Sequence, residues 1–373
     1  MTKANPVLDL IRILRAWFGY SPVARLYAVL ALGKGVVLLS VLYIEPTLDV
    51  FHVMGTRWDS NYYEIIAIHG YGTGAPHVFS PVYPVLIKIV YFVVGNVWVS
   101  ALLVTNLSSL LFPLVVYKTF GYKTALLAEV FPTYLVFTTI AYSDIIALVL
   151  LALAFFFLLK EKFVKSSLAL SIAIFTFVNL ALTLPAFGVA LLSRKRFRYL
   201  YFFALPFLTG LFILLWFKIV AGSYFAFLQL EAPWGATFVT PLGQALYLAC
   251  AQGVGSFTCQ HWALLGFVFP RIYWPIRNIA FESFYSIGTY FVLRINSSQR
   301  VLLFLYDLCV ILPILFISGT PAMSIPRLLL PAFPAFVGYS SFFKSWRATS
   351  VYVASCLCLA AVISVIEYFS FFA

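Results

Sequence analysis

Residues 57–71 read RWDSNYYEIIAIHGY, and residues 79–88 read FSPVYPVLIK. This polar and aromatic stretch follows an apolar run at 23–44 that is long enough to cross a bilayer, since about 20 residues span its core. Asp59 therefore lies where the chain leaves the membrane, between the Trp and Tyr residues typical of the interface. A partly desolvated carboxylate gains basicity and suits general-base work on a hydroxyl. The alternative is equally open, because Asp59 could cap a helix over 60–68.

Away from this stretch, the composition is that of a membrane protein. Of the 373 residues, 63% are hydrophobic and 10% are charged, and the mean hydropathy is +1.01. Soluble domains have about 45–50% apolar and about 25% charged residues. The composition therefore excludes a water-soluble globule, a disordered chain and a disulfide scaffold. It predicts an all-α polytopic membrane protein.

The basic residues indicate how the chain crosses the membrane. The 24 Lys and Arg against 12 Asp and Glu give a net charge of +12, which in a soluble protein would suggest nucleic-acid binding. In a membrane protein the positive-inside rule accounts for this charge, so we expect no nucleic-acid partner. Residues 6–20 carry charges among apolar positions and are typical of an interfacial helix. Seventeen basic residues lie in six clusters: Lys3, Arg12, Arg15 and Arg25; Lys118 and Lys123; Lys160, Lys162 and Lys165; Arg194, Lys195, Arg196 and Arg198; Arg294 and Arg300; Lys344 and Arg347.

Placing these clusters and the N-terminus in the cytoplasm predicts about eleven spans, within a range of about nine to thirteen. Residues 45–95 then form a first outer loop with a juxtamembrane helix over 81–94, and residues 222–278 form a second outer loop. We divide the chain into a transmembrane module at 1–221, this second loop, and C-terminal transmembrane helices at 279–373. The predicted spans are 23–44, 96–117, 124–141, 143–159, two half-spans at 166–180 and 181–193, 199–221, 279–293, 301–318, 326–343 and 348–371.

Half of the twelve acidic side chains map to the outer side in this topology, among them Asp59, Glu64 and Asp144. A site at the outer membrane surface is therefore expected. Glu129 and Asp307 instead lie inside predicted spans. Acidic residues in such positions are functional candidates, although they can also pair with polar neighbours.

The stretch at 57–71, followed by FSPVYP at 79–84, resembles the signature of the PIG-V family, the second mannosyltransferase of GPI-anchor synthesis, and of its prokaryotic relatives. These proteins belong to the GT-C superfamily of multi-span glycosyltransferases. Weaker similarities follow in the same order along most of the chain: AYSD at 141–144, then Phe225, Gln229 and Trp234, and PRLLLPAFP at 326–334. The chain departs from the family at Asp144, where Glu is commoner, and at 183–185, where TLP replaces a basic pair.

The resemblance implies a GT-C-type fold whose first outer loop carries the catalytic Asp, so that the module at 1–221 is the catalytic one. It further implies inverting transfer of mannose from a polyprenyl-phosphate carrier, such as dolichyl-phosphate mannose, to a glycolipid or glycan acceptor outside the cytoplasm. Asp59 would be the general base for the acceptor hydroxyl. Arg327 and Arg57 would bind the donor phosphate, because a guanidinium can hold phosphate with two hydrogen bonds. Arg327 could instead extend to the lipid headgroups.

Further residues are candidates for binding the substrate. Asp144 could orient the acceptor or, together with Asp59, hold a divalent cation such as Mg²⁺ or Mn²⁺; it could also be an exposed loop carboxylate. The other candidates are the aromatic, polar and histidine side chains of the resembling motifs, each of which could equally be structural: Tyr63, His69, Tyr83, Gln229 and Trp234.

Several other functions stay open. A related transferase could use a different polyprenyl-phosphate hexose, since the motif does not specify the sugar. A lipid or glycolipid transporter is disfavoured by the lack of internal repeats and favoured by Glu129 and Asp307. A non-catalytic subunit of a glycosylation complex is the third possibility. The protein would lie in the plasma membrane of a prokaryote, or in the endoplasmic reticulum of a eukaryote with its site in the lumen.

Overall fold

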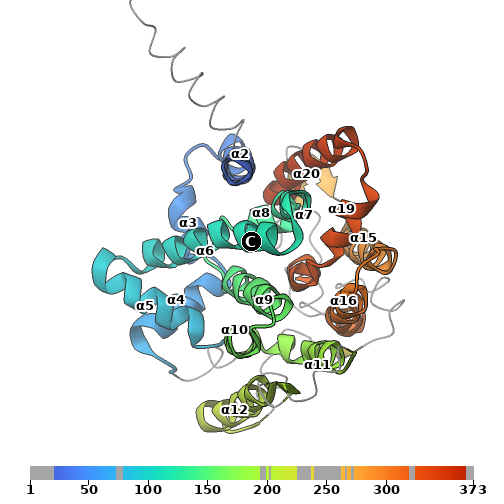
Figure 1. Cartoon of the computed structure of the whole chain (residues 1–373). Helices are drawn as coiled ribbons and strands as arrows, with labels where there is room; N and C mark the ends of the chain where they lie inside the picture. Colours follow the sequence, from blue (N-terminus) through green and yellow to red (C-terminus); the bar gives the residue numbers. More distant parts are fainter. Residues whose placement is uncertain are drawn as a thin grey trace, which may run out of the picture.

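The computed structural model describes residues 21–72, 79–193, 199–200, 203–224, 237–238, 262–264, 267–269, 273–318 and 324–366. The interfacial helix expected over 6–20 lies outside these residues. The described chain is overwhelmingly helical, and α2 and α16 are seen nearly end-on in Figure 1. Its helices are α2 (Pro22–Ile44), α3 (Val50–Thr56), α4 (Asp59–His69), α5 (Val82–Val94), α6 (Val97–Phe120), α7 (Tyr122–Glu129), α8 (Pro132–Phe137), α9 (Asp144–Leu159), α10 (Phe163–Thr176), η2 (Val178–Thr183), α11 (Leu184–Ser193), α12 (Ala204–Ala221), α15 (Tyr273–Leu293), α16 (Arg300–Ile314), α18 (Ile325–Leu328), η6 (Leu330–Ala332), α19 (Ala335–Phe342) and α20 (Trp346–Ile366).

Two short antiparallel strand pairs accompany the helices. Strand β1 (Thr237–Phe238) pairs with β4 (Ile317–Ser318), and β2 (Trp262–Leu264) pairs with β3 (Phe267–Phe269). With so few residues in strands, the backbone hydrogen bonds of the membrane part are made within helices. This is the arrangement that a hydrocarbon solvent requires.

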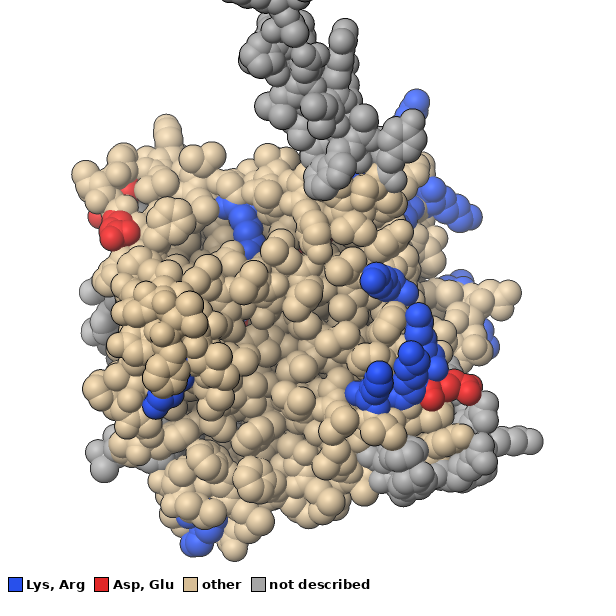
Figure 2. All heavy atoms as spheres, turned by 60° about the vertical axis from the view of Figure 1, so that its left-hand side comes forward, with Lys and Arg blue, Asp and Glu red and all other residues tan. Residues whose placement is uncertain are grey.

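The outside of the helical part is apolar, as expected for a membrane protein. Within the described residues, four helices are long and apolar enough to cross a membrane, namely α2, α6, α12 and α20. Large hydrophobic side chains on α12 are exposed, including Phe207 and Ile219. Uncharged side chains predominate on the face shown in Figure 2. Such a surface is stable against lipid and not against water.

Two predicted spans are not continuous helices. The span expected at 124–141 is divided into α7 and α8, and the one expected at 326–343 is divided into α18, η6 and α19. Proline lies at each division, at Pro132 and at Pro331 and Pro334, where its ring and missing N–H prevent a continuous helix. These divisions free backbone carbonyls inside the helical part, and side chains of neighbouring helices bond to them, as Tyr306 Oη does to Pro331 O at 3.1 Å.

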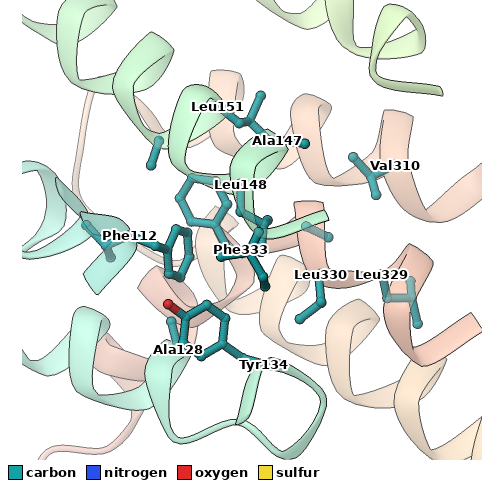
Figure 3. Packing of buried hydrophobic residues seen from close by; sticks show 14 of the residues in the cluster. Phe112, Ala128, Tyr134, Ala147, Leu148, Leu151, Val310, Leu329, Leu330 and Phe333 are labelled. Atoms are coloured by element: carbon teal, nitrogen blue, oxygen red, sulfur yellow. The ribbon is translucent and has the colours of Figure 1, made fainter. Parts of the chain in front are cut away.

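A hydrophobic core joins helices α6 to α9 to the C-terminal helices (Figure 3). The ring of Phe333 lies 5.5 Å from that of Phe112 on α6 and 5.7 Å from that of Phe155 on α9, edge-on in both cases. Helix α2 also packs against α20. Residues 1–221 and the C-terminal helices therefore share a core, and this brings residues of the C-terminal part next to the 45–95 segment.

Helices α15 and α19 are in backbone contact where Gly288 faces Gly338. A Cβ atom at Gly338 would overlap the carbonyl oxygen of Gly288 and lie 2.9 Å from the amide nitrogen of Val292. Because neither atom can rotate away, we predict that Gly338→Ala forces the helices apart and destabilises the protein by about 1–3 kcal/mol, as overpacking does. Thermal unfolding in detergent measures this as a lower Tm.

The matched control is Gly210→Ala on α12, since no atom lies within 4 Å of a Cβ built there. Its Tm should stay unchanged or rise, because Gly in a helix interior costs about 0.5–1 kcal/mol relative to Ala. Equal Tm values for the two variants would contradict close packing at Gly338.

Candidate active site

Asp59 begins helix α4 directly after a sharp bend. The bend is at Trp58, whose φ of 61° and ψ of −127° are unusual for a residue with a side chain. Backbone of this kind costs about 1–3 kcal/mol and persists only where the surroundings hold it. Here the Trp58 ring packs edge-on against Tyr142 at 6.4 Å. Asp59 is the first helical residue and its carboxylate bonds to a distant side chain, so the interpretation of Asp59 as a helix cap is wrong.

That distant side chain is Arg327 on α18, 268 residues further along the chain. Its Nη1 donates a hydrogen bond of 2.7 Å to Oδ2 of Asp59, and its Nε lies 3.8 Å from Oδ1 of Asp144. The exposed fractions of the Arg327, Asp59 and Asp144 side chains are 17%, 29% and 8%. Arg327 therefore lies between two carboxylates, and the alternative that it extends to the lipid headgroups is wrong.

Aromatic rings enclose the guanidinium of Arg327 as well. Its central carbon lies 5.1 Å from the ring centre of Tyr142 and 5.9 Å from that of Phe137. These distances are in the range of cation–π attraction. Within the described residues, Nε of Arg327 has no hydrogen-bond partner. This Nε is buried on the side of Asp144, while Nη1 is held by Asp59.

The loop of residues 138–143, between α8 and α9, supports this ion pair. Neighbouring elements hold the loop by hydrogen bonds to its backbone and side chains, so that Tyr142 and Asp144 are fixed beneath Arg327. These bonds are Ser60 Oγ to Ala141 O (2.8 Å), Ala141 N to Met54 O (3.1 Å), Thr105 Oγ1 to Tyr142 O (3.3 Å), Asp59 N to Tyr142 Oη (3.4 Å), and Tyr63 Oη with Ser143 Oγ (2.7 Å).

A surface hollow of about 750 Å³ opens beside Asp59. Its walls come from α3, the bend and the first turn of α4, and they are mainly polar and aromatic. Arg327 and Asp144 do not line it, so Asp59 separates the hollow from the guanidinium. Side chains of this kind can both hydrogen-bond to and stack on a sugar ring. The lining residues are His52, Val53, Thr56, Arg57, Trp58, Asp59, Asn61 and Tyr62.

The other predicted site residues lie in different settings. Arg57 lines the hollow, with its guanidinium 5.7 Å from the Trp58 ring. Tyr63 is buried and bonds to Ser143, while Tyr83 is fully buried and bonds to Ala101 O and Thr105, so neither tyrosine lines the hollow. His69 is exposed at the end of α4, about 15 Å along the helix from Asp59. Gln229 and Trp234 lie outside the described residues.

The sequence interpretation missed His52, Thr56, Asn61 and Tyr62, which line the hollow. A signal for two of them was present, because His52 and Thr56 are four residues apart and therefore share one face of a helix. Asn61 and Tyr62 were inside the quoted stretch, but periodicity alone does not show which residues of a short helix face a cavity.

The predicted pair of Asp59 and Asp144 does not fit a divalent cation between its members. The guanidinium of Arg327 occupies that place, with contacts of 2.7 and 3.8 Å to the two carboxylates. Within the described residues, no group of three or more His, Cys, Asp or Glu side chains is arranged to hold a metal.

The acidic residues of the predicted spans are fully buried away from the hollow. Asp307 Oδ2 accepts a hydrogen bond of 3.2 Å from Thr289, which is the polar pairing considered as an alternative. Neither carboxylate oxygen of Glu129 has a hydrogen-bond partner within the described residues.

The carboxyl of Glu64 on α4 makes the stability of the folded protein depend on pH. Burial raises the pKa of its carboxyl from 4.5 to about 7, and its Oε1 has no hydrogen-bond partner among the described residues. Between these two pKa values the folded protein binds more protons than the unfolded chain, so stability falls as the pH rises from 4.5 through about 7. We predict a lower Tm in detergent at pH 8 than at pH 5, and a smaller difference in Glu64→Gln. The exposed Glu45→Gln is the control, and an unchanged difference in Glu64→Gln would contradict the prediction.

Comparison with known proteins identifies the fold. No family model and no curated protein matches the sequence. The crystal structure of ArnT from Cupriavidus metallidurans bound to undecaprenyl phosphate superposes with a TM-score of 0.53 and 16% identity, over 90% of this chain and 63% of that one. The apo structure of the same protein has a TM-score of 0.47 and 15% identity, over 84% of this chain and 62% of that one. ArnT is a GT-C superfamily glycosyltransferase.

The chain is thus an all-α membrane protein with the GT-C-type fold, which confirms the predicted fold class. It spans about 63% of the length of the ArnT structure that it matches.

Proposed function

We propose that this protein is an integral-membrane glycosyltransferase that moves a sugar from a polyprenyl-phosphate carrier to a glycolipid or glycan acceptor. The observation that carries the proposal is the position of Asp59, which lines the hollow on one side and bonds to Arg327 on the other at 2.7 Å. The GT-C-type fold supports it. So does the undecaprenyl phosphate bound to the similar ArnT structure, which is consistent with a lipid donor.

The arrangement suits direct displacement with inversion. The acceptor would enter the hollow, and its hydroxyl oxygen would bond to the anomeric carbon of the donor as the bond from that carbon to the phosphate oxygen breaks. Asp59 would take the hydroxyl proton during the attack. The released phosphate monoester needs no proton, but its negative charge needs a partner.

Arg327 supplies that partner in this mechanism. A guanidinium has five N–H donors and can bind phosphate through two parallel hydrogen bonds. Asp144 would orient Arg327 from the opposite side, at 3.8 Å from Nε. Arg57 lies on the wall of the hollow. It would bind the donor phosphate, the role that the resemblance implies, if the phosphate of the donor enters the hollow.

The finer assignments extend this proposal. We propose mannose as the sugar and a PIG-V-like relationship because of the stretch at 57–71. The site would face away from the cytoplasm, the N-terminus would lie inside, and the module at 1–221 would be catalytic together with Arg327. The clustering of Lys and Arg between the apolar runs supports this orientation.

The experiment is a transfer assay with the purified protein in lipid nanodiscs. Polyprenyl phosphates carrying radiolabelled mannose, glucose or arabinose are each incubated with a glycolipid extract, and the label in the acceptor fraction is counted. We expect transfer with the mannose donor. Transfer with another donor only would correct the sugar. Label remaining on every donor, together with movement of the lipid across proteoliposome membranes, would favour a transporter instead.

A further inference from the structure

Helix α2 carries a lysine in the middle of its apolar length. Lys34 lies between Pro22 and Ile44, and its Nζ donates three hydrogen bonds, to Asn106 Oδ1 at 2.7 Å, Ser109 Oγ at 2.7 Å and Thr138 O at 3.0 Å. An ammonium group has three protons, so the acceptors match it completely. All three acceptors are uncharged, and within the described residues no carboxylate pairs with Lys34. A lysine inside a span is costly, which calls for a specific role.

The third acceptor connects Lys34 to the candidate active site. Thr138 follows α8 and is the first residue of the 138–143 loop. The residue before it, Phe137, lies under the guanidinium of Arg327, and so does Tyr142 near the other end of the loop. Lys34 therefore binds the backbone at Thr138, the residue that follows Phe137, and both Phe137 and Tyr142 contact Arg327.

The packing of α2 allows this contact. A Cβ atom built on Gly33 would lie 2.5 Å from Cδ2 of Leu135 on α8. The absence of a side chain at Gly33 thus lets α2 approach α8 closely. The next residue, Lys34, can then reach the carbonyl of Thr138 where α8 ends.

We propose that Lys34 is a positioning residue that acts on the site through Thr138. By fixing the start of the 138–143 loop, it keeps Tyr142 and Asp144 in place around Arg327, which in turn bonds to Asp59. The competing role is a simple tie between α2 and α6, for which the bonds to Asn106 and Ser109 are sufficient. Only the positioning role requires the bond from Lys34 to the carbonyl of Thr138.

The first test does not need enzyme activity. Hydrogen exchange of the peptide covering 138–143 is followed by mass spectrometry in the full-length wild type, Lys34→Met and Ser109→Ala. Met preserves the length of the side chain and removes its hydrogen bonds, whereas Ser109→Ala removes one α6 acceptor and leaves the bond to Thr138. We expect exchange in this loop to rise at least about tenfold in Lys34→Met and to stay unchanged in Ser109→Ala. Equal exchange in all three proteins, or the same rise in Ser109→Ala, would overturn the proposal.

The second test rests on the proposed function. Sugar transfer by Lys34→Met should show a kcat lower by about ten- to a hundredfold, as small misplacements of a site can cause, with the KM for the acceptor unchanged. Lys34→Arg should recover part of the kcat because it retains the charge and the donors.

A double variant that combines Lys34→Met with Asp144→Asn distinguishes a positioning role of Lys34 from a general loss of folding. If Lys34 acts through the loop, the double variant Lys34→Met/Asp144→Asn should have nearly the kcat of Asp144→Asn alone. Multiplied losses in the double variant would overturn the proposal. Should the wild type show no transfer at all, the proposed function fails, and hydrogen exchange still decides the role of Lys34.

Discussion

Asp59→Asn is expected to lose sugar transfer by about 10²–10⁴-fold, the usual contribution of a general base. Asn has nearly the shape of Asp, and its side-chain oxygen can still accept the hydrogen bond that Arg327 donates at 2.7 Å. The amide cannot accept the proton of the acceptor hydroxyl, so the loss should appear in kcat. Radiolabel transfer in nanodiscs measures it, with folding monitored by Tm.

Asp49→Asn is the matched control for this variant. Asp49 is exposed ten residues before Asp59 and caps α3 by accepting a hydrogen bond from the amide of His52 at 3.2 Å. Asn caps helices as well as Asp does, so transfer should be retained. Full activity in Asp59→Asn would remove Asp59 as the base.

Arg327→Gln is expected to have the second large effect, a loss of transfer of about 10²–10³-fold, comparable to removing one group that stabilises transition-state charge. Arg327→Lys should lose less, because it keeps the charge but not the two-pronged geometry. Donor titrations in the transfer assay should show a raised KM for the lipid donor in both variants. Arg300→Gln, at the exposed start of α16, is the control and should behave as wild type.

The thermal stability of Arg327 variants tests the role of this residue independently of sugar transfer. Removing Arg327 leaves Asp59 and Asp144 without the cation that lies between them. Breaking a fully buried pair costs about 3–5 kcal/mol, and the cost here should be lower because the Asp59 side chain is 29% exposed. Adding Asp144→Asn to Arg327→Gln should restore part of the Tm, since one uncompensated carboxylate is removed. A further drop in Tm would contradict the charge arrangement.

The hydrophobic and charge patterns sufficed to predict an all-α membrane protein. Apolar content and the spacing of Lys and Arg act locally, through transfer of each segment into lipid, so they can be read along the chain. The juxtamembrane helix expected at 81–94 is α5, and the hairpin expected at 166–193 corresponds to α10, η2 and α11. The segments predicted as single spans at 124–141 and 326–343 are each divided, because proline interrupts a helix without lowering the hydropathy of the segment.

The sequence motifs predicted Asp59, Asp144 and Arg327 as separate candidate site residues. The structure places these three side chains together. The motifs did not distinguish Tyr63 and Tyr83, which are buried, from Asn61 and Tyr62, which line the hollow. These four residues have similar polarity and lie within one stretch. Only the packing of α4 and α5 against α6 determines which side chains face inward.

The sequence by itself determined the membrane class of this protein and its helical build, because these follow from local hydropathy, charge and spacing. The tertiary structure alone decided that Arg327, 268 residues from Asp59, pairs with that carboxylate, and that Lys34 reaches Thr138. Such pairings depend on where the proline-interrupted helices pack against one another. No periodicity along the chain encodes the distance between residues brought together by that packing.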